Sequence, residues 1–124
     1  MTISEVSKKY GLTPDTLRYY ERIGVIPTVR RGSNGLRDYS EEDCGWVEHV
    51  KCMRSAGLPI ETIIEYVRLM QEGDSTIPAR RQLLLEQRKH LEAQLEVIRD
   101  TMERLDYKIA RYDEAMKTGV LTWE

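Results

Sequence analysis

Residues 79–118 contain neither glycine nor proline, and this forty-residue stretch restricts the fold more than any other feature of the chain. Glycine and proline are the residues that most often end helices, so the stretch predicts one continuous helix. At about 1.5 Å per residue, that helix is about 60 Å long. A compact domain built from the other residues cannot cover it along its whole length. We therefore expect a mainly α-helical chain with an elongated C-terminal element.

Apolar side chains in this region recur every seven residues, along two lines. The first line is Ile77, Leu84, Leu91, Ile98, Leu105 and Tyr112, and the second is Arg81, Arg88, Leu95, Met102, Ile109 and Met116. Ten of these twelve residues are apolar or aromatic, which is the pattern of a coiled-coil seam. One helix cannot bury such a seam by itself, and the simplest partner is a second copy of the chain.

We therefore predict a homodimer that forms through this long helix. The residues expected in its interface are Leu84, Leu91, Leu95, Ile98, Met102, Leu105, Ile109 and Tyr112. An intramolecular helical hairpin is the alternative way to cover the seam. No turn signal interrupts the stretch, however, so the sequence favours the dimer.

Helix-starting and helix-ending residues divide the first part of the chain into short helices. Thr2 and Glu5 have the spacing of a capping box, in which each side chain binds the other residue's backbone N–H. Gly11 is expected to end that helix, and Thr13 followed by Pro14 begins the next one. Two short helices joined by about three residues are typical of a helix-turn-helix.

The next segment predicts a small β-hairpin, which is the wing of a winged helix-turn-helix. Residues 25–30 are prone to form a strand, 32–35 have the composition of a turn, and 36–39 can return as a second short strand. Ser40 then has the position of a helix N-cap, and the three acidic residues after it suit the positive end of a helix dipole.

A second helix pair is expected after the hairpin. The first of its helices runs from Ser40 to Gly57, and the other starts at Pro59 and ends at Gly73. The sequence thus predicts three parts. Residues 1–73 form the winged helix-turn-helix domain with the second helix pair, 76–118 form the coiled-coil dimerisation helix, and 119–124 form a short tail.

Charge is distributed unevenly, although the net charge is only −2. Residues 1–40 hold seven Lys or Arg against four Asp or Glu, and residues 41–75 hold three against eight. The remainder holds nine of each. If DNA is the partner, its phosphates must meet the first forty residues, where basic side chains are in excess.

The second helix and the hairpin carry side chains that can bind double-stranded DNA. Arg18, Tyr19 and Arg22 share the helix face away from Leu17, and such side chains donate to phosphates and base edges. Tyr20 shares the face of Leu17 and is expected in the core. The predicted DNA contacts are Thr16, Arg18, Tyr19, Arg22, Arg30, Arg31, Asn34, Arg37 and Tyr39. An ordinary solvated surface is the alternative reading of this helix face.

Three motifs resemble the MerR family of bacterial transcription regulators. Residues 13–24 read TPDTLRYYERIG, residues 34–39 read NGLRDY, and residues 53–60 read MRSAGLPI. With the coiled coil, the resemblance covers essentially the whole chain. It implies a winged helix-turn-helix, a second helix pair and an antiparallel dimerisation helix.

The same resemblance implies how the chain acts. It places Arg18 and Tyr19 on the recognition helix, and Arg37 and Tyr39 on the wing. Family members bind pseudo-palindromic promoters and distort the DNA so that RNA polymerase can engage both recognition elements. Double-stranded promoter DNA and RNA polymerase are therefore the expected partners.

Cys44 and Cys52 are eight residues apart in one predicted helix, a spacing that makes a disulfide between them implausible, and free thiols are expected. The segment around Cys52, residues 50–54, resembles the thiol-sensing branch of the family, which responds to aldehydes or other electrophiles. On a helical wheel Cys52 points about 160° away from Val50, the centre of the apolar face, and so faces outward. Cys52 is the candidate effector-sensing residue, and an inert packing cysteine is the alternative.

Other functions fit the sequence less well. Metal-sensing relatives use cysteines at the end of the long helix, but no Cys or His follows His90, so a thiolate metal site there is not expected. The six residues after Thr118 are too few for a ligand pocket. His49 and His90 lie in unrelated segments, and no catalytic constellation can be assembled from spacing. We predict neither an enzyme nor a cofactor; a coiled-coil adaptor without sequence-specific DNA binding is the alternative function.

The location of the protein is predicted from two further features. The first ten residues include charged side chains and lack the apolar core of a secretory signal. The longest apolar runs are only a few residues, far shorter than a bilayer requires. We therefore expect a soluble, cytoplasmic protein with no membrane partner.

Overall fold

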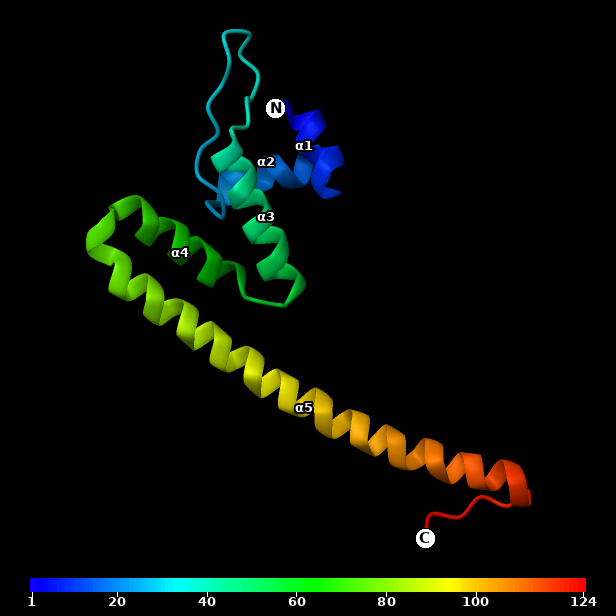
Figure 1. Ribbon diagram of the computed structural model, residues 1–124. Coiled ribbons are helices and arrows are strands. Elements are labelled where there is room, and N and C mark those ends of the chain that lie inside the picture. Colours follow the sequence, from blue (N-terminus) through cyan, green and yellow to red (C-terminus); the bar gives the residue numbers. More distant parts are fainter. The chain divides into compact units, whose positions relative to one another are not determined.

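The computed structural model describes all residues, 1–124, and confirms a mainly α-helical fold (Figure 1). Its helices are α1 (Ile3–Tyr10), α2 (Pro14–Ile23), α3 (Glu41–Ser55), α4 (Ile60–Glu72) and α5 (Ile77–Thr118), with a 3-10 turn, η1 (Asp74–Thr76), before α5. Contacts divide the chain into two compact units, residues 1–85 and 86–124, with the boundary inside α5. No helix combines the length and the apolar composition needed to cross a lipid bilayer.

The predicted starts of the first two helices are confirmed. Thr2 Oγ1 accepts a hydrogen bond from the Glu5 amide at 3.1 Å, and the Thr2 amide donates to Glu5 Oε1 at 3.0 Å. The hydrogen bond from the Thr2 amide, followed by one from the Thr2 side chain, lowers the pKa of the Glu5 carboxyl. Thr13 caps α2 by accepting a hydrogen bond from the Thr16 amide, with Pro14 at the start of the helix. Gly11 ends α1 with φ 67°, a left-handed conformation that glycine adopts without strain. The connection between α1 and α2 is therefore short and fixed at both ends.

The second helix pair also begins and ends near the predicted residues. Ser40 and Asp43 form a capping box at the start of α3, with hydrogen bonds of 2.9 and 3.1 Å. The α1 helix packs against α2 and α3, and α3 packs against α4. The four helices therefore surround a common interior.

One hydrophobic core lies inside the unit of residues 1–85. It is formed by buried side chains from α1 to α4 and from the segments between α2 and α3. These residues are Val6, Leu17, Val25, Ile26, Val29, Tyr39, Cys44, Val47, Val50 and Ile63. Tyr20 packs against this cluster from its edge, as its place beside Leu17 predicts. The helix-turn-helix thus shares one interior with the second helix pair.

The predicted β-hairpin is corrected to a loop, which we call the wing loop (residues 30–38). It holds one isolated antiparallel bridge, Arg31 with Arg37, and no regular strand. Val25 and Ile26 are consecutive and both are buried in the core, so this segment lacks the alternation of buried and exposed side chains that a half-buried strand needs. The β-branched residues Val25 and Ile26, which made the segment prone to form a strand, fill the core and do not take part in a β-ladder.

The first turn of α5 is fastened to the end of α4. Thr76 Oγ1 donates to the Leu69 carbonyl at 2.5 Å, and Arg80 Nη2 donates to the Gly73 carbonyl at 3.2 Å. These contacts satisfy carbonyl groups that the end of a helix leaves without a partner. The reversal between α4 and α5 is therefore tied down by side chains.

The α5 helix is one continuous helix of 42 residues, as its lack of internal glycine predicts. None of its residues is buried within the single chain. In the middle of the seam, Leu95, Ile98 and Met102 expose 46, 54 and 56% of their surface. The isolated chain thus leaves its seam in contact with solvent.

The tail, residues 119–124, folds back along the last turns of α5. Arg111 Nε donates to the Thr122 carbonyl at 2.8 Å, and Tyr107 Oη donates to the Trp123 carbonyl at 2.5 Å. The Trp123 ring meets the Tyr112 ring edge-on, with 5.8 Å between centroids. The tail therefore has defined contacts with its own helix.

Candidate nucleic-acid interface

The outer face of α2 presents two guanidinium groups and a phenol to solvent. The Arg18 side chain is 48% exposed and pairs with Asp15 at 2.9 Å. The Arg22 guanidinium lies 5.2 Å from the centroid of the Tyr19 ring, an arrangement in which the ring face attracts the cation. Leu17, on the opposite face, is fully buried. The helix is therefore anchored by one side and offers a cationic, aromatic side to a partner.

Thr16 lies in the first turn of α2 and takes part in its cap. Its amide donates to Thr13 Oγ1 at 3.1 Å, and the two hydroxyl oxygens are 2.8 Å apart. This places a second hydroxyl at the end of the helix where free N–H groups gather. Such an end favours the binding of anions, including phosphate.

The wing loop adds further basic side chains to the surface. Arg30 and Arg31 are exposed, and Arg31 Nη1 donates to the Gly35 carbonyl at 2.9 Å. Asn34 Oδ1 accepts from the Leu36 amide at 3.0 Å and so shapes the tip of the loop. Asn34 thus has a structural role in the loop that the sequence does not indicate.

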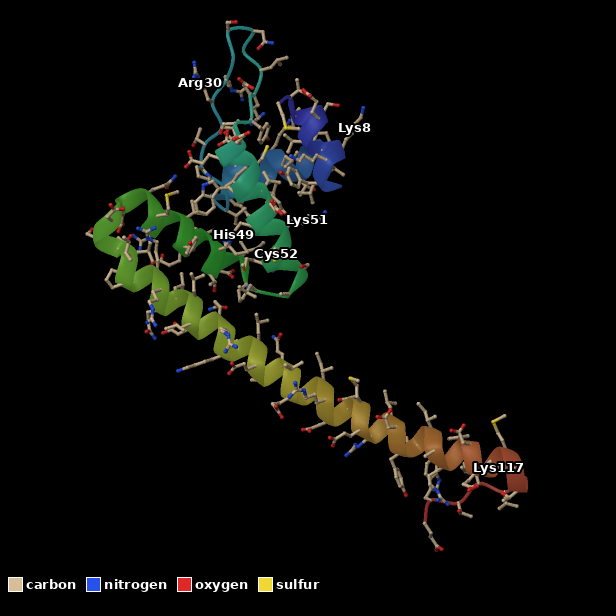
Figure 2. The ribbon with its side chains drawn as sticks, viewed as in Figure 1. Lys8, Arg30, His49, Lys51, Cys52 and Lys117 are labelled. Carbon is tan, nitrogen blue, oxygen red and sulfur yellow. The ribbon has the colours of Figure 1, made fainter.

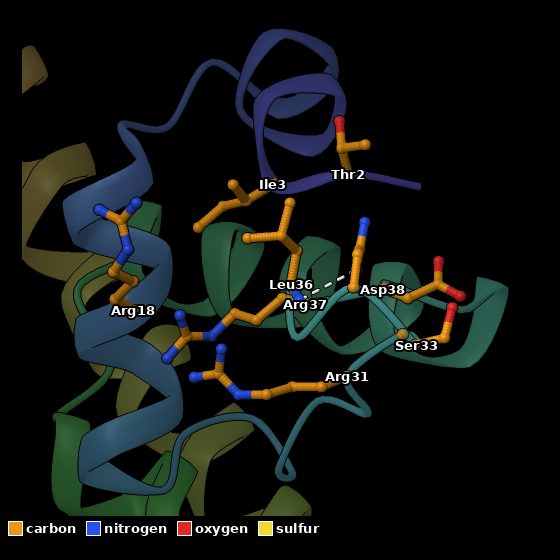
Figure 3. A pocket seen from close by; sticks show the side chains of 10 residues that line it. Thr2, Ile3, Arg18, Arg31, Ser33, Leu36, Arg37 and Asp38 are labelled. Carbon is orange, nitrogen blue, oxygen red and sulfur yellow. Dashed lines mark hydrogen bonds between the residues drawn. The ribbon is translucent and has the colours of Figure 1, made fainter.

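Side chains from α2 and the wing loop meet at one cavity of about 310 Å³ (Figure 3). Arg18 comes from the helix, and Arg31 and Arg37 come from the loop. The prediction that the two elements present basic groups to the same surface agrees with this arrangement. Guanidinium groups form paired hydrogen bonds with phosphate oxygens, so the cavity has the chemistry of a site for a nucleic-acid backbone.

Arg37 differs from the other predicted contacts because it is already engaged within the protein. Its Nε donates to Glu21 Oε1 at 2.7 Å, and the two side chains are only 19 and 15% exposed. Sequence analysis did not single out Glu21. Its position one turn after Arg18, on the same side of α2, is the signal that could have identified it.

Tyr39 is a core residue, and the prediction that it contacts DNA is corrected. Its side chain is 2% exposed, and its hydroxyl is buried without a hydrogen-bond partner. Burial raises the pKa of the Tyr39 phenol above its ordinary value. The residue lies just before the α3 cap, where the chain returns to the core, so it anchors the base of the wing loop and does not extend from it.

Cys52 is exposed on α3 (Figure 2), as the helical wheel predicts. Cys44 is buried. Both are free thiols. The residue beside Cys52, Lys51, donates from its Nζ to the Tyr10 carbonyl at 2.5 Å, which ties α3 to the end of α1. The helix that carries Cys52 is thereby connected to the helix-turn-helix.

An aromatic cluster on α3 and α4 was not predicted. His49 stacks on Tyr66 with 5.2 Å between ring centroids, and Trp46 lies 5.7 Å from His49 and 5.9 Å from Tyr66. Burial lowers the pKa of His49 below its ordinary value. No group of three His, Cys, Asp or Glu side chains is placed to hold a metal ion. His49 is thus a packing residue between the two helices.

Two protein families match this chain. The MerR HTH family regulatory protein matches residues 1–70, and the family described as MerR, DNA binding, matches residues 46–107. Together they extend from the helix-turn-helix into the long helix.

Curated relatives carry the same description. The transcriptional regulator AdhR of Bacillus subtilis strain 168 is 55% identical over 91 residues, which cover 73% of this chain. The match spans 65% of AdhR, less than two thirds of its length. YfmP, also an HTH-type transcriptional regulator of that strain, is 30% identical over 95% of this chain and 81% of its own.

Two solved structures have the same fold along nearly the whole chain. A putative MerR family regulator from Listeria monocytogenes has a TM-score of 0.92 and 42% identity, over 96% of this chain and 90% of its own. HiNmlR, a MerR family regulator lacking the sensor domain and bound to promoter DNA, has a TM-score of 0.83 and 29% identity, over 95 and 94%.

These matches confirm the resemblance that the motifs carry and the prediction of a regulator rather than an enzyme. The matched regions contain the helix-turn-helix, its cationic face and α5 as far as residue 107. The chain belongs to the MerR family of helix-turn-helix regulatory proteins and is a DNA-binding transcriptional regulator of the MerR type.

Proposed function

We propose that this regulator binds a double-stranded promoter with α2 in the major groove and the wing loop on the flanking backbone. Arg18 and Tyr19 then reach base edges, and Arg30 and Arg31 bind phosphates. The observation that carries the proposal is the cavity that Arg18 and Arg31 share, because it brings cationic groups from two elements to one surface. Thr16, Arg22 and Asn34 complete the proposed set. HiNmlR is bound to promoter DNA in its structure, which supports promoter DNA as the partner of this chain.

An Arg18→Ala variant tests the base contact directly. Loss of one good base contact costs about 1–3 kcal/mol, so the variant should bind its promoter about 5- to 150-fold more weakly in a gel-shift titration. Arg68→Ala is the matched control, because Arg68 is similarly exposed, 54%, and pairs with Glu65 on α4. An Arg18→Ala protein with the affinity of the parent would contradict the assignment. A parent that shows no sequence-specific, salt-sensitive shift would favour the adaptor function instead.

The wing arginines should behave differently from Arg18. Contacts with phosphates carry no sequence information, so Arg30→Ala and Arg31→Ala should weaken binding to every duplex. Each should also reduce the slope of log affinity against log salt by about 0.9. A loss confined to the promoter sequence would place these residues on bases.

We further propose that α5 pairs with the α5 helix of a second copy, in antiparallel orientation, and that the dimer reads the two halves of a pseudo-palindrome. The half-exposed seam supports this proposal, because Leu95, Ile98 and Met102 have no partner within the chain. In this arrangement the bound dimer distorts the promoter so that RNA polymerase engages both of its elements. The regulator acts on the bacterial chromosome, and so in the cytoplasm.

Cys52 is the proposed sensor of aldehydes or other electrophiles. It is exposed, whereas Cys44 is only 6% exposed, so a dissolved electrophile meets Cys52 first. A promoter–reporter fusion treated with formaldehyde or methylglyoxal should respond with the parent protein and with Cys44→Ala. The Cys52→Ala protein should not respond. Equal responses of the parent and Cys52→Ala would remove Cys52 from the mechanism.

A further inference from the structure

The ion pair of Glu21 and Arg37 connects α2 to the wing loop across sixteen residues of sequence. The Nε to Oε1 distance is 2.7 Å, and more than four fifths of each side chain is withdrawn from solvent. Arg37 is thus much less accessible to a partner than Arg18, whose side chain is 48% exposed. Removing one partner of a pair this well covered leaves the other charge poorly solvated, so it costs more than removing one partner of an exposed pair.

The backbone of the wing loop gives it little rigidity of its own. One bridge joins Arg31 to Arg37, and it consists of two hydrogen bonds of 2.8 Å, from the Gly32 amide to the Leu36 carbonyl and from the Asp38 amide to the Arg30 carbonyl. So short a ladder is marginal without support from elsewhere. The bridge residue Arg37 is also the residue that reaches α2, so its side chain fastens the loop to that helix, while Asp38 fastens the loop to the N-terminal amine.

The charges around the cavity explain why an acidic residue is needed there. Arg18, Arg31 and Arg37 all line it, and three like charges repel one another. Asp38 is also at the cavity, but it binds the N-terminal amine at 3.2 Å. Glu21 is the carboxylate that binds Arg37. Arg18, which pairs with the exposed Asp15, and Arg31 keep exposed side chains that a phosphate can reach.

We propose that Arg37 is a positioning residue, which fixes the wing loop on α2 through Glu21 and does not itself bind DNA phosphates. This inference rests on the DNA-binding surface proposed above. It has an unexpected consequence, because Glu21 then supports DNA binding although its charge repels phosphates. Removing that charge should weaken the complex, whereas simple electrostatics requires it to tighten.

The first experiment measures the affinity of Glu21→Gln for the promoter. We expect binding to weaken about tenfold, or about 1.4 kcal/mol, with an unchanged salt slope. Glu65→Gln is the matched control, since Glu65 also pairs with an arginine, Arg68, but lies on α4 and does not line the cavity. Its substitution should leave promoter binding unchanged. Glu21→Gln binding as tightly as the parent, or more tightly, overturns the proposal.

A double-mutant cycle with Arg37→Gln separates positioning from phosphate contact. If the pair acts as a unit, the doubly substituted protein binds no more weakly than either single variant, and its salt slope equals that of the parent. If Arg37 binds a phosphate, the slope of Arg37→Gln and of the double variant falls by about 0.9, which overturns the proposal. Far-UV circular dichroism checks that each variant is folded. If Glu21→Gln alone unfolds, the promoter affinity and salt slope of the variant with both substitutions test the proposal instead.

Amide hydrogen exchange of the free protein tests the loop without DNA. The amides of Gly32 and Asp38 donate the two hydrogen bonds of the bridge, so they should exchange faster in Glu21→Gln than in the parent. Unchanged exchange overturns the positioning role. If exchange is faster in Glu21→Gln but the parent protein binds no promoter, the positioning role of Arg37 is supported and the proposed DNA-binding function is refuted.

Discussion

The four-helix part of the chain and the α5 helix both contain regularly spaced apolar residues, yet they differ in how these are covered. In residues 1–73, Val6, Leu17 and Val47 are fully buried in one core. In α5 no residue is buried, and Ile98 keeps 54% of its surface exposed. The apolar pattern of the first part is covered inside the chain, whereas the pattern of α5 is not, and the proposed dimer would cover it. The first part should therefore have a stability independent of protein concentration, and α5 should not.

Of the substitutions considered, charges placed in the α5 seam should have the largest effect, because they act on the dimer itself. We expect Ile98→Asp with Met102→Asp to abolish the dimer at micromolar concentration in sedimentation experiments, since each unpaired buried charge costs at least about 3 kcal/mol. Val97→Asp is the control, because Val97 is apolar and 65% exposed but lies outside both lines of the seam. A doubly substituted protein that sediments as a dimer would show that the chains pair elsewhere.

Truncation of the core in the first part should have the next largest effect. Leu17→Ala removes a fully buried side chain and should lower the free energy of unfolding by about 2–5 kcal/mol in urea titrations. Leu36→Ala, at a leucine that is 64% exposed, should change it by less than about 0.5 kcal/mol. The loss at Leu17 should be the same at low and high protein concentration. A loss that depends on concentration would mean that the two regions are not independent.

The parts of the fold that sequence analysis predicted are set by neighbouring residues. The capping box of Thr2 and Glu5 joins residues three apart, and the continuity of α5 follows from the absence of helix-ending residues. The seam depends on a seven-residue period that can be counted. Such features require no knowledge of how distant segments pack.

The parts that were missed depend on packing between distant segments. Arg37 pairs with Glu21, sixteen residues away, only because the wing loop folds onto α2. Tyr39 is buried because the chain returns to the core before α3, although its neighbour Asp38 is exposed. Sequence reasoning treated every polar or aromatic side chain of the loop as surface. In a loop this short, adjacent residues have opposite environments.

Tyr39→Phe tests whether Tyr39 belongs to the core, and it should change the free energy of unfolding less than Leu17→Ala does. The hydroxyl of Tyr39 is buried without a hydrogen-bond partner, so its removal should raise the free energy of unfolding by about 1 kcal/mol. Promoter affinity should stay that of the parent, because the hydroxyl does not reach the surface. Weaker DNA binding by Tyr39→Phe would restore the direct contact that the sequence predicts.

The smallest expected effect concerns His49 and the pH dependence of the first part. Burial lowers the pKa of His49 in the folded chain below its value in the unfolded chain, so unfolding takes up a proton as the pH falls through the unfolded pKa. The free energy of unfolding should therefore decrease from pH 7.5 to pH 5.5, with a contribution below about 1.4 kcal/mol per pH unit, the limit for one proton. His49→Gln should flatten this dependence in urea titrations at each pH. Because His49 stacks between α3 and α4 and not on α5, the flattening should be equal at all protein concentrations. A pH dependence that is identical in His49→Gln, or that appears only at concentrations where the chain dimerises, would place the titrating group outside this cluster.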